Sequence, residues 1–165
     1  MKALFIGRFQ PFHNGHLEVI KFIINKCNFL VIGIGSSQYK NTKENPFSLE
    51  ERKDMINNTL KEHNIKDYKL IEIPDIHNPP RWVEHVLNIY SDFDVVYTNN
   101  NFTKKLFEEK GFKVQATSIF NKKEYSGKII REKIKKDLDW EKSVPDQVSD
   151  IINKIEGKKR LKNCI

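Results

Sequence analysis

Five strand-like segments separated by helical segments predict an α/β fold, namely an open parallel five-stranded sheet with helices on both faces. The strand-like segments are short apolar runs, and the segments between them carry apolar residues at helical spacing. These connections are long enough for the right-handed crossovers that join parallel strands. The length of 165 residues suits a single domain, whose core needs neither disulfides nor a metal to be stable.

The chain opens with a strand, a loop and a helix. Residues 2–6 are apolar and end at Gly7, and residues 14–26 repeat leucine and isoleucine at helical spacing. The apolar run 29–34 predicts the second strand. Residues 36–46 are polar and aperiodic, and they predict a loop of the length that functional loops tend to have.

The same alternation continues to the end of the chain. Ser48 and Glu51 have the spacing of a capping box, so the next helix is expected to begin there. The later segments are strands 68–73, 93–97 and 112–116, helices 82–90 and 102–110, and C-terminal helices 126–136 and 145–156. Ser126 can cap the first C-terminal helix. The basic tail 157–165 is expected to fray or to serve in contacts.

The composition narrows the class of function. A net charge of +7, from 29 Lys and Arg against 22 Asp and Glu, suits a polyanionic partner, either nucleic acid or nucleotide. The longest apolar stretch, 29–34, is too short to cross a bilayer, and no signal-peptide pattern begins the chain. The two cysteines have no metal-type spacing and are expected to be free thiols. We therefore expect a soluble cytoplasmic protein without a membrane partner.

Residues 7–16, Gly-Arg-Phe-Gln-Pro-Phe-His-Asn-Gly-His, lie between the first strand and the first helix. Gly15 lets an anion approach backbone N–H groups at the helix N-terminus. His13 and His16 can donate to one anion, and Arg8 can bind two of its oxygens. The segment matches neither the P-loop nor the dinucleotide fingerprint, and the histidines have no third zinc ligand. These four groups in one loop predict a phosphate site. The alternative, which the grouping makes less favourable, is that His13 caps the loop, His16 packs against the sheet and Arg8 is a solvated surface charge.

The same segment resembles the signature of the HxGH nucleotidyltransferase superfamily and is most similar to the archaeal-type nicotinamide mononucleotide adenylyltransferases. Further segments are similar to that family in the same order. They are residues 34–38, 45–47 with Glu51 and Arg52, 74–76, 82–83, 120–121, and 125–127 with Arg131. The resemblance covers nearly the whole chain, to about Arg160, and it implies a Rossmann-like sheet of the nucleotidyltransferase type.

The resemblance implies an enzyme of NAD biosynthesis that transfers AMP from ATP to nicotinamide mononucleotide, giving NAD and pyrophosphate. It also implies Mg²⁺ that arrives with ATP, and a homo-oligomer with a hexamer as one candidate. A phosphomonoester is already mostly dianionic at neutral pH, so the enzyme needs no catalytic base. Its task is positioning and charge stabilisation. The catalytic residues expected for this task are Arg8, His13, His16 and Arg131.

The resemblance also implies two sets of binding residues. The ATP-binding set is Gly7, Arg8, Phe9, His13, Gly15, His16, Phe120, Asn121, Ser126, Gly127 and Arg131. The substrate-binding set is Gly35, Ser36, Asp75, Ile76, Trp82 and Asn100, with the Trp82 ring stacked on nicotinamide. No dedicated metal site is expected, since no carboxylate cluster has the spacing for one.

Several residues depart from the family's pattern. Lys128 stands where a small hydroxyl residue is usual, and Glu44 stands where some members have arginine. Asn78 comes one place earlier than the expected asparagine, and residues 99–101 differ from the usual Ser-Gly-Asn-Pro. These departures concern the binding of the substrates rather than the class of reaction.

Two other functions remain open. Another member of the superfamily, acting on pantetheine phosphate, a flavin nucleotide or a small phosphoalcohol, can use the same loop, although Trp82 and residues 74–76 favour the nicotinamide substrate. A basic nucleic-acid-binding module without catalysis would also suit the charge. Against it, the lysines alternate with Glu and Asp on the predicted helices and form no single stripe. We therefore expect no nucleic-acid partner.

Overall fold

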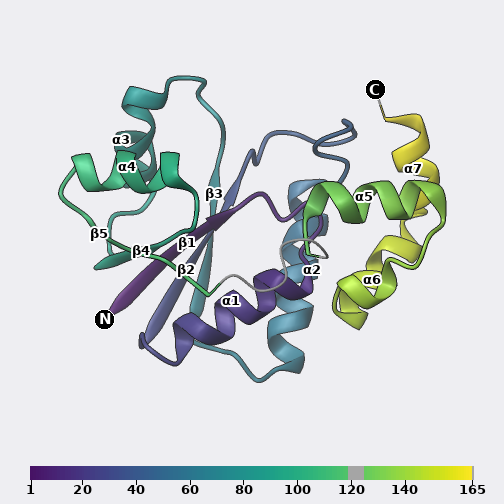
Figure 1. Ribbon diagram of the computed structural model, residues 1–165, viewed down its shortest axis with the longest axis horizontal. Coiled ribbons are helices and arrows are strands. Elements are labelled where there is room, and N and C mark those ends of the chain that lie inside the picture. Colours follow the sequence, from purple (N-terminus) through teal and green to yellow (C-terminus); the bar gives the residue numbers. More distant parts are fainter. Residues whose placement is uncertain (119–124, 165) are drawn as a thin grey trace. The chain divides into compact units, whose positions relative to one another are not determined.

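The computed structural model describes residues 1–118 and 125–164 (Figure 1). Contacts within the chain divide it into two compact units. The sheet unit comprises Met1–Gly7, Val19–Ser37 and Asp67–Ile119, and the helical unit comprises Arg8–Glu18, Gln38–Lys66 and Phe120–Ile165. Each unit is therefore built from segments that are far apart in the sequence, and the expectation of a single domain stays a prediction.

The sheet unit contains the five-stranded parallel sheet that the sequence predicts. Its strands are β1 (Lys2–Gly7), β2 (Phe29–Gly35), β3 (Tyr68–Ile73), β4 (Val95–Tyr97) and β5 (Lys113–Gln115). Their spatial order, β3-β2-β1-β4-β5, reverses direction at β1. In open α/β sheets, ligands bind beyond the carboxyl ends of the strands at such a reversal. The predicted fold class is confirmed.

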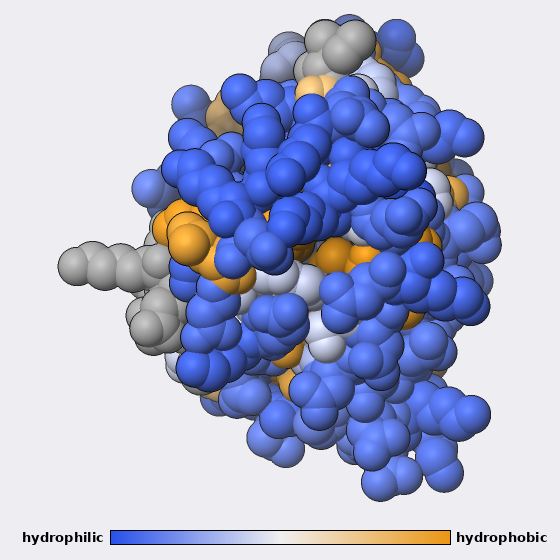
Figure 2. Space-filling view, turned by 90° about the vertical axis from the view of Figure 1, so that its right-hand side faces the viewer, coloured by the Kyte–Doolittle hydropathy of each residue, from blue (hydrophilic) through white to orange (hydrophobic). Residues whose placement is uncertain are grey.

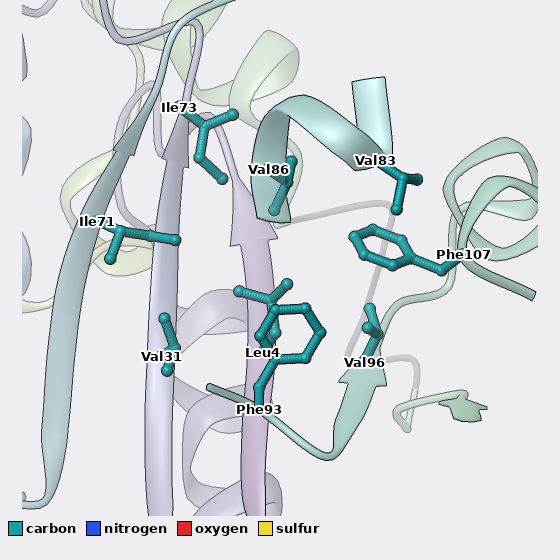
Figure 3. Close-up of a cluster of buried hydrophobic side chains, with 9 residues drawn as sticks. All are labelled: Leu4, Val31, Ile71, Ile73, Val83, Val86, Phe93, Val96 and Phe107. Atoms are coloured by element: carbon teal, nitrogen blue, oxygen red, sulfur yellow. The ribbon is translucent and has the colours of Figure 1, made fainter. Parts of the chain in front are cut away.

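Helices cover both faces of the sheet. Figure 3 shows the apolar side chains that join one face to α3 (Pro79–Ile89) and α4 (Asn101–Glu109). This buried cluster comprises Leu4, Val31, Ile71, Ile73, Val83, Val86, Phe93, Val96 and Phe107. Alternate strand residues point to the opposite face, where Phe22 of α1 (Asn14–Ile24) meets Tyr97 edge-on, with ring centroids 6.3 Å apart.

The helical unit is organised around α2 (Leu49–Glu62). Its other helices are α5 (Gly127–Lys136), the 3₁₀ turn η1 (Glu141–Ser143), α6 (Asp146–Lys154) and α7 (Gly157–Asn163). Helix α2 packs on α6, and α7 packs on both α5 and α6. The capping box is confirmed, because Ser48 Oγ accepts from the Glu51 N–H at 3.2 Å and Glu51 Oε2 accepts from the Ser48 N–H at 2.8 Å. None of the helices in residues 1–118 and 125–164 is long and apolar enough to span a bilayer.

Some elements differ from the prediction at their ends. Strand β4 begins at Val95, because Phe93 before it turns into the buried cluster of the sheet unit. Ser126 does occupy the N-cap position of α5. Within the described residues, however, its side chain makes no capping hydrogen bond, so the hydroxyl does not serve the role that the sequence predicts.

The end of the chain is helical, which corrects the expectation that the tail frays. Helix α7 buries Leu161, and Arg160 Nη1 donates to Glu51 Oε2 at 2.5 Å and to the Pro46 carbonyl at 3.4 Å. The Lys158 ammonium pairs with Asp137 at 2.5 Å. The expected contacts are thus present, and they hold α7 against the start of α2 and the end of α5.

Candidate active site

The loop after β1 brings His13 and His16 together as a reciprocal pair. The His13 backbone N–H donates to His16 Nδ1 at 3.2 Å, and the His16 backbone N–H donates to His13 Nδ1 at 3.3 Å. The rings stack with centroids 3.5 Å apart and 18° between their planes. Because each Nδ1 accepts a hydrogen bond, the proton of each neutral imidazole lies on Nε2. The pair therefore offers two adjacent Nε2–H donors, which suits an anion such as phosphate.

The two imidazoles are neutral near pH 7. Burial lowers the pKa of His13 to about 4. Burial, together with the adjacent His13 ring, lowers the pKa of His16 well below its ordinary value of 6.5. The histidines can therefore bind an anion through hydrogen bonds, while the positive charge at the site comes from arginine and lysine.

The low pKa of His13 predicts a fold that is sensitive to acid. Between pH 6.5 and about 4, the unfolded chain protonates this imidazole and the folded chain does not. The free energy of unfolding should therefore fall as the pH drops through this window, by about 3 kcal/mol at its lower end. Urea unfolding of the ligand-free protein at about pH 7.5 and about pH 4.5 measures the change. In His13→Gln the contribution of His13 should disappear while that of the buried His16 remains, so the pH dependence should become smaller; an unchanged dependence in that variant contradicts the assignment.

Aromatic rings hold the histidine pair in place. The buried rings of Phe9 and Phe12 lie with their centroids 4.8 and 5.5 Å from that of His16. At Gly15 there is no room for a side chain, because a Cβ atom would lie 2.9 Å from Tyr125 Cβ and 3.1 Å from the His13 ring. The glycine thus lets the ring of His13 lie against the first turn of α1.

Two buried polar side chains anchor the same loop to α2. Gln10 donates to the Phe47 carbonyl at 2.8 Å and accepts from the Phe47 N–H at 2.9 Å. Arg52 is fully buried and donates from Nη1 to the Arg8 carbonyl at 2.9 Å and from Nε to the Ser48 carbonyl at 3.3 Å. Sequence reasoning gave neither side chain a role at the site. Arg52 appeared there only within a family motif, and no local pattern shows that a given arginine is buried.

The helix α5 adds a second cation to the loop. Arg131 Nη1 donates to the Gln10 carbonyl at 2.7 Å, and a Cβ atom on Gly127 would lie 3.1 Å from both that nitrogen and that oxygen. Burial, and then the nearby Arg8 guanidinium, lower the pKa of Arg131. Two neighbouring cations, one of them partly buried, favour an anionic ligand.

A cavity of about 280 Å³ opens beside these arginines in the helical unit. Its lining residues are Arg8, Lys43, Glu44, Lys128, Arg131, Glu132, Lys135 and Leu161. Two of the four expected catalytic residues, Arg8 and Arg131, line this basic cavity, whereas His13 and His16 do not.

A second cavity, of about 260 Å³, lies in the sheet unit beyond the ends of β3 and β4. It is lined by Asp75, Ile76, His77, Asn78, Pro79, Trp82, Phe102, Thr103 and Leu106. The Trp82 ring packs edge-on against Phe107, with ring centroids 5.8 Å apart, so the core fixes its orientation. Ser36 Oγ donates to Asp75 Oδ2 at 2.7 Å, which links the end of β2 to this cavity.

The predicted site residues thus fall into two groups. Arg8, Phe9, His13, Gly15, His16, Ser126, Gly127 and Arg131 lie in the helical unit, whereas Gly7, Gly35, Ser36, Asp75, Ile76, Trp82 and Asn100 lie in the sheet unit. Asn100 does not line the second cavity, and its Oδ1 instead caps α4 by accepting from the Thr103 N–H at 2.9 Å. Phe120 and Asn121 lie outside the described residues. Lys128 lines the basic cavity.

Comparison with known proteins decides the family. The cytidylyltransferase-like family matches residues 4–133. A nicotinamide-nucleotide adenylyltransferase from Archaeoglobus fulgidus is 46% identical over 168 residues, which cover 99% of this chain and 97% of the relative. A protein of the same name from Picrophilus torridus is 42% identical over 163 residues, which cover 99% of this chain and 96% of the relative. The chain belongs to the nicotinamide-nucleotide adenylyltransferase family.

Solved structures confirm the fold of this adenylyltransferase family member. A bifunctional NMN adenylyltransferase/ADP ribose pyrophosphatase from Francisella tularensis, complexed with AMP and a manganese ion, matches with a TM-score of 0.74 at 22% identity. The match covers 98% of this chain but only 55% of the bifunctional protein, so the chain spans about half of its length. A putative nicotinate-nucleotide adenylyltransferase from Vibrio parahaemolyticus matches with a TM-score of 0.67 at 18% identity, covering 99% of this chain and 97% of that one.

Proposed function

We propose that this adenylyltransferase family member transfers the AMP moiety of ATP to nicotinamide mononucleotide, giving NAD and pyrophosphate. The observation that carries the proposal is the reciprocal pair of His13 and His16 in the same loop that Arg131 contacts. The name shared by relatives over nearly the full length supports the choice of substrates.

The helical unit supplies the groups that the reaction needs at phosphate. An oxygen of the mononucleotide phosphate attacks the α-phosphorus of ATP, the bond from that phosphorus to the β-phosphate bridge breaks, and its electron pair leaves with pyrophosphate. In this proposal the Nε2–H groups of His13 and His16 donate to the α-phosphate, where charge develops during transfer. The guanidinium groups of Arg8 and Arg131 offset the repulsion between the two anions.

The sheet unit supplies a site for the mononucleotide. The Trp82 ring in the second cavity offers a flat apolar surface on which a nicotinamide ring can stack. Asp75 adds a carboxylate whose position is fixed by Ser36. We assign Gly35, Ser36, Asp75, Ile76, Trp82 and Asn100 to this substrate, as the resemblance implies. The Oδ1 atom of Asn100 caps α4, so in this proposal Asn100 contributes through its Nδ2–H group.

The proposed reaction includes a divalent cation that arrives bound to ATP. Mg²⁺ is coordinated by few protein ligands and many waters, and it neutralises phosphate charge when it is bound. Within the described residues, no group of three or more His, Cys, Asp or Glu side chains is placed to hold a metal. Glu44 and Glu132 both line the basic cavity, so their carboxylates are the side chains there that fit a metal carried by the triphosphate.

The proposal also covers the location of the enzyme in the cell, its oligomeric state and its partners. We expect a cytoplasmic homo-oligomer, with a hexamer as one candidate, that has no nucleic-acid or membrane partner. The cytoplasm supplies ATP and Mg²⁺ together, and sedimentation of the purified protein measures the number of subunits.

The test is an assay of the purified chain with ATP, Mg²⁺ and nicotinamide mononucleotide, in which a coupled dehydrogenase reports NAD. Nicotinic acid mononucleotide, pantetheine phosphate and flavin mononucleotide serve as alternative acceptors in parallel reactions. We expect NAD formation, with pyrophosphate released in equal amount. Transfer to another acceptor but not to nicotinamide mononucleotide would assign the chain to a different reaction of the superfamily, and tight binding of generic RNA without transfer would favour the nucleic-acid alternative.

A further inference from the structure

A short loop between β3 and α3, residues 74–78, forms part of the wall of the second cavity. Asp75, Ile76, His77 and Asn78 all line that cavity. His77 has a left-handed backbone conformation, with φ at 51°, which residues other than glycine adopt at an energetic cost. A loop in this conformation keeps its shape only where the surrounding elements hold it.

The end of β2 holds this loop from one side. Ser36 Oγ donates to Asp75 Oδ2 at 2.7 Å, and the Ser37 backbone N–H donates to the Ile73 carbonyl at 3.3 Å. Both serines directly follow β2, the strand that pairs with β3. These two contacts fix the residues on either side of position 74.

Helix α3 holds the same loop through the side chain of His85. Its Nε2 atom lies 2.9 Å from the Pro74 carbonyl oxygen. A carbonyl oxygen only accepts, so Nε2 carries the proton and donates it. Proline has no backbone N–H, so this carbonyl is the only backbone group that can be hydrogen-bonded at position 74. The imidazole thus fixes the residue directly before Asp75.

The helix that carries His85 is itself fixed on the sheet. Val83 and Val86 belong to the buried cluster drawn in Figure 3, as does Ile73 at the end of β3, and α3 packs on β3. His85 lies between the two valines in the sequence and is half-buried. Its donor is therefore presented to the loop from a rigid element.

His85 does not line the second cavity. It lines a separate cavity of about 340 Å³, which shares Ile76 and Asn78 with the second cavity. The loop therefore has the second cavity on one side and His85 on the other. Ile76 and Phe102 are 36% and 58% exposed at the second cavity, whereas the face that carries α5, α6 and α7 is mostly hydrophilic, with small apolar patches in its hollows (Figure 2). Exposed apolar side chains gathered around a cavity suit the flat ring of a ligand.

We propose that His85 is a positioning residue for the mononucleotide, because its hydrogen bond to Pro74 keeps residues 74–78 in the conformation that binds this substrate. The inference rests on the proposed function, which places the mononucleotide in the second cavity. Without the bond, the loop with its left-handed His77 relaxes to other conformations. The apparent affinity then falls in proportion to the fraction of molecules that keep the binding-competent conformation. Transfer from the bound complex is not slowed, since His85 does not line the cavity that holds the substrate.

The experiment compares three substitutions at position 85. His85→Ala removes the ring, His85→Phe keeps a ring without a donor, and His85→Gln supplies an amide N–H at about the reach of Nε2. Asn88→Ala is the matched control, because Asn88 is exposed and lines the same separate cavity one turn later along α3. The measured quantities are kcat and the KM values for nicotinamide mononucleotide and ATP. Calorimetry with nicotinamide mononucleotide alone measures binding without catalysis, and thermal unfolding reports the fold.

We expect His85→Ala and His85→Phe to raise the KM and the dissociation constant for nicotinamide mononucleotide about tenfold, the effect of one lost hydrogen bond in a partly buried site. The kcat and the KM for ATP should stay close to those of the parent protein. His85→Gln should restore most of the affinity, and Asn88→Ala should match the parent. If the alanine variant does not fold, the comparison of His85→Phe with His85→Gln tests the same donor.

A merely structural role of His85 gives a different result. It lowers the thermal midpoint and the active fraction of the protein but leaves both KM values unchanged, and that result overturns the inference. A KM for ATP that rises as much as the KM for nicotinamide mononucleotide overturns it as well. Binding of nicotinamide mononucleotide that depends on His85, in a protein that makes no NAD, overturns the proposed transfer alone. A parent protein that neither binds nicotinamide mononucleotide nor forms NAD overturns both.

Discussion

Replacing His16 by alanine is expected to lower kcat for NAD formation by about two to three orders of magnitude, the usual loss on removing one preorganised donor to a developing charge. Two of the polar roles of the His16 ring are lost at once. The Nε2–H donor disappears, and the His13 backbone N–H loses its acceptor at Nδ1. Steady-state rates with saturating ATP and nicotinamide mononucleotide give kcat, and pyrophosphate release gives an independent measure of turnover.

The matched control for this variant is His63→Ala. His63 is an exposed histidine at the C-cap of α2, so its removal should leave kcat unchanged. Thermal unfolding of both variants shows whether a lower kcat comes from impaired catalysis or from loss of folded protein. A kcat of His16→Ala within about threefold of that of the His63 control would remove the histidine pair from the mechanism, because a factor of three is less than 1 kcal/mol of barrier.

Arg52→Ala is expected to lower the free energy of unfolding by about 3 kcal/mol or more, one of the largest losses that a single substitution in this chain can produce. The arginine is fully buried, so the truncated side chain leaves a cavity. The carbonyls of Arg8 and Ser48 also lose a charged donor in an interior that water does not reach. Urea unfolding monitored by circular dichroism measures the change.

Two further variants separate packing from hydrogen bonding at this position. Arg52→Met retains much of the volume and removes the guanidinium, so its unfolding free energy reports the lost hydrogen bonds, those to Arg8 and Ser48 among them. Lys53→Ala is the control, since Lys53 is the next residue of the helix, is only partly buried and pairs with the exposed Glu50 at 3.1 Å. If Arg52→Ala is as stable as Lys53→Ala, the buried guanidinium does not stabilise the loop.

Much of the fold can be predicted from the sequence because its signals are local. The apolar runs 2–6 and 29–34 alternate with helical patterns, and the capping box of Ser48 and Glu51 marks the start of α2 within one turn. The phosphate-binding character of the first loop is likewise visible in one segment, since its histidines lie three residues apart.

The remaining features depend on contacts between distant residues, which no local pattern encodes. Arg52 reaches the Arg8 carbonyl across 44 positions, and Arg160 reaches Glu51 across 109. The sequence shows both arginines as charged residues on polar segments. Only the three-dimensional structure shows that Arg52 is buried and that Arg160 holds α7 against α2. The same holds for the exchange of hydrogen bonds between His13 and His16, because either histidine alone is consistent with a solvated side chain.

The division of the chain into two units has a consequence for any attempt to dissect it. Six consecutive segments alternate between the sheet unit and the helical unit, so no single cut yields a fragment that contains one unit entire. Many of the contacts in each unit join residues that are remote in the sequence, a topology with high contact order that folds slowly compared with a helical bundle of the same size. Truncation libraries and fragment complementation should therefore recover neither unit as an autonomous module, and the basic cavity and the second cavity are better studied by point substitution than by deletion.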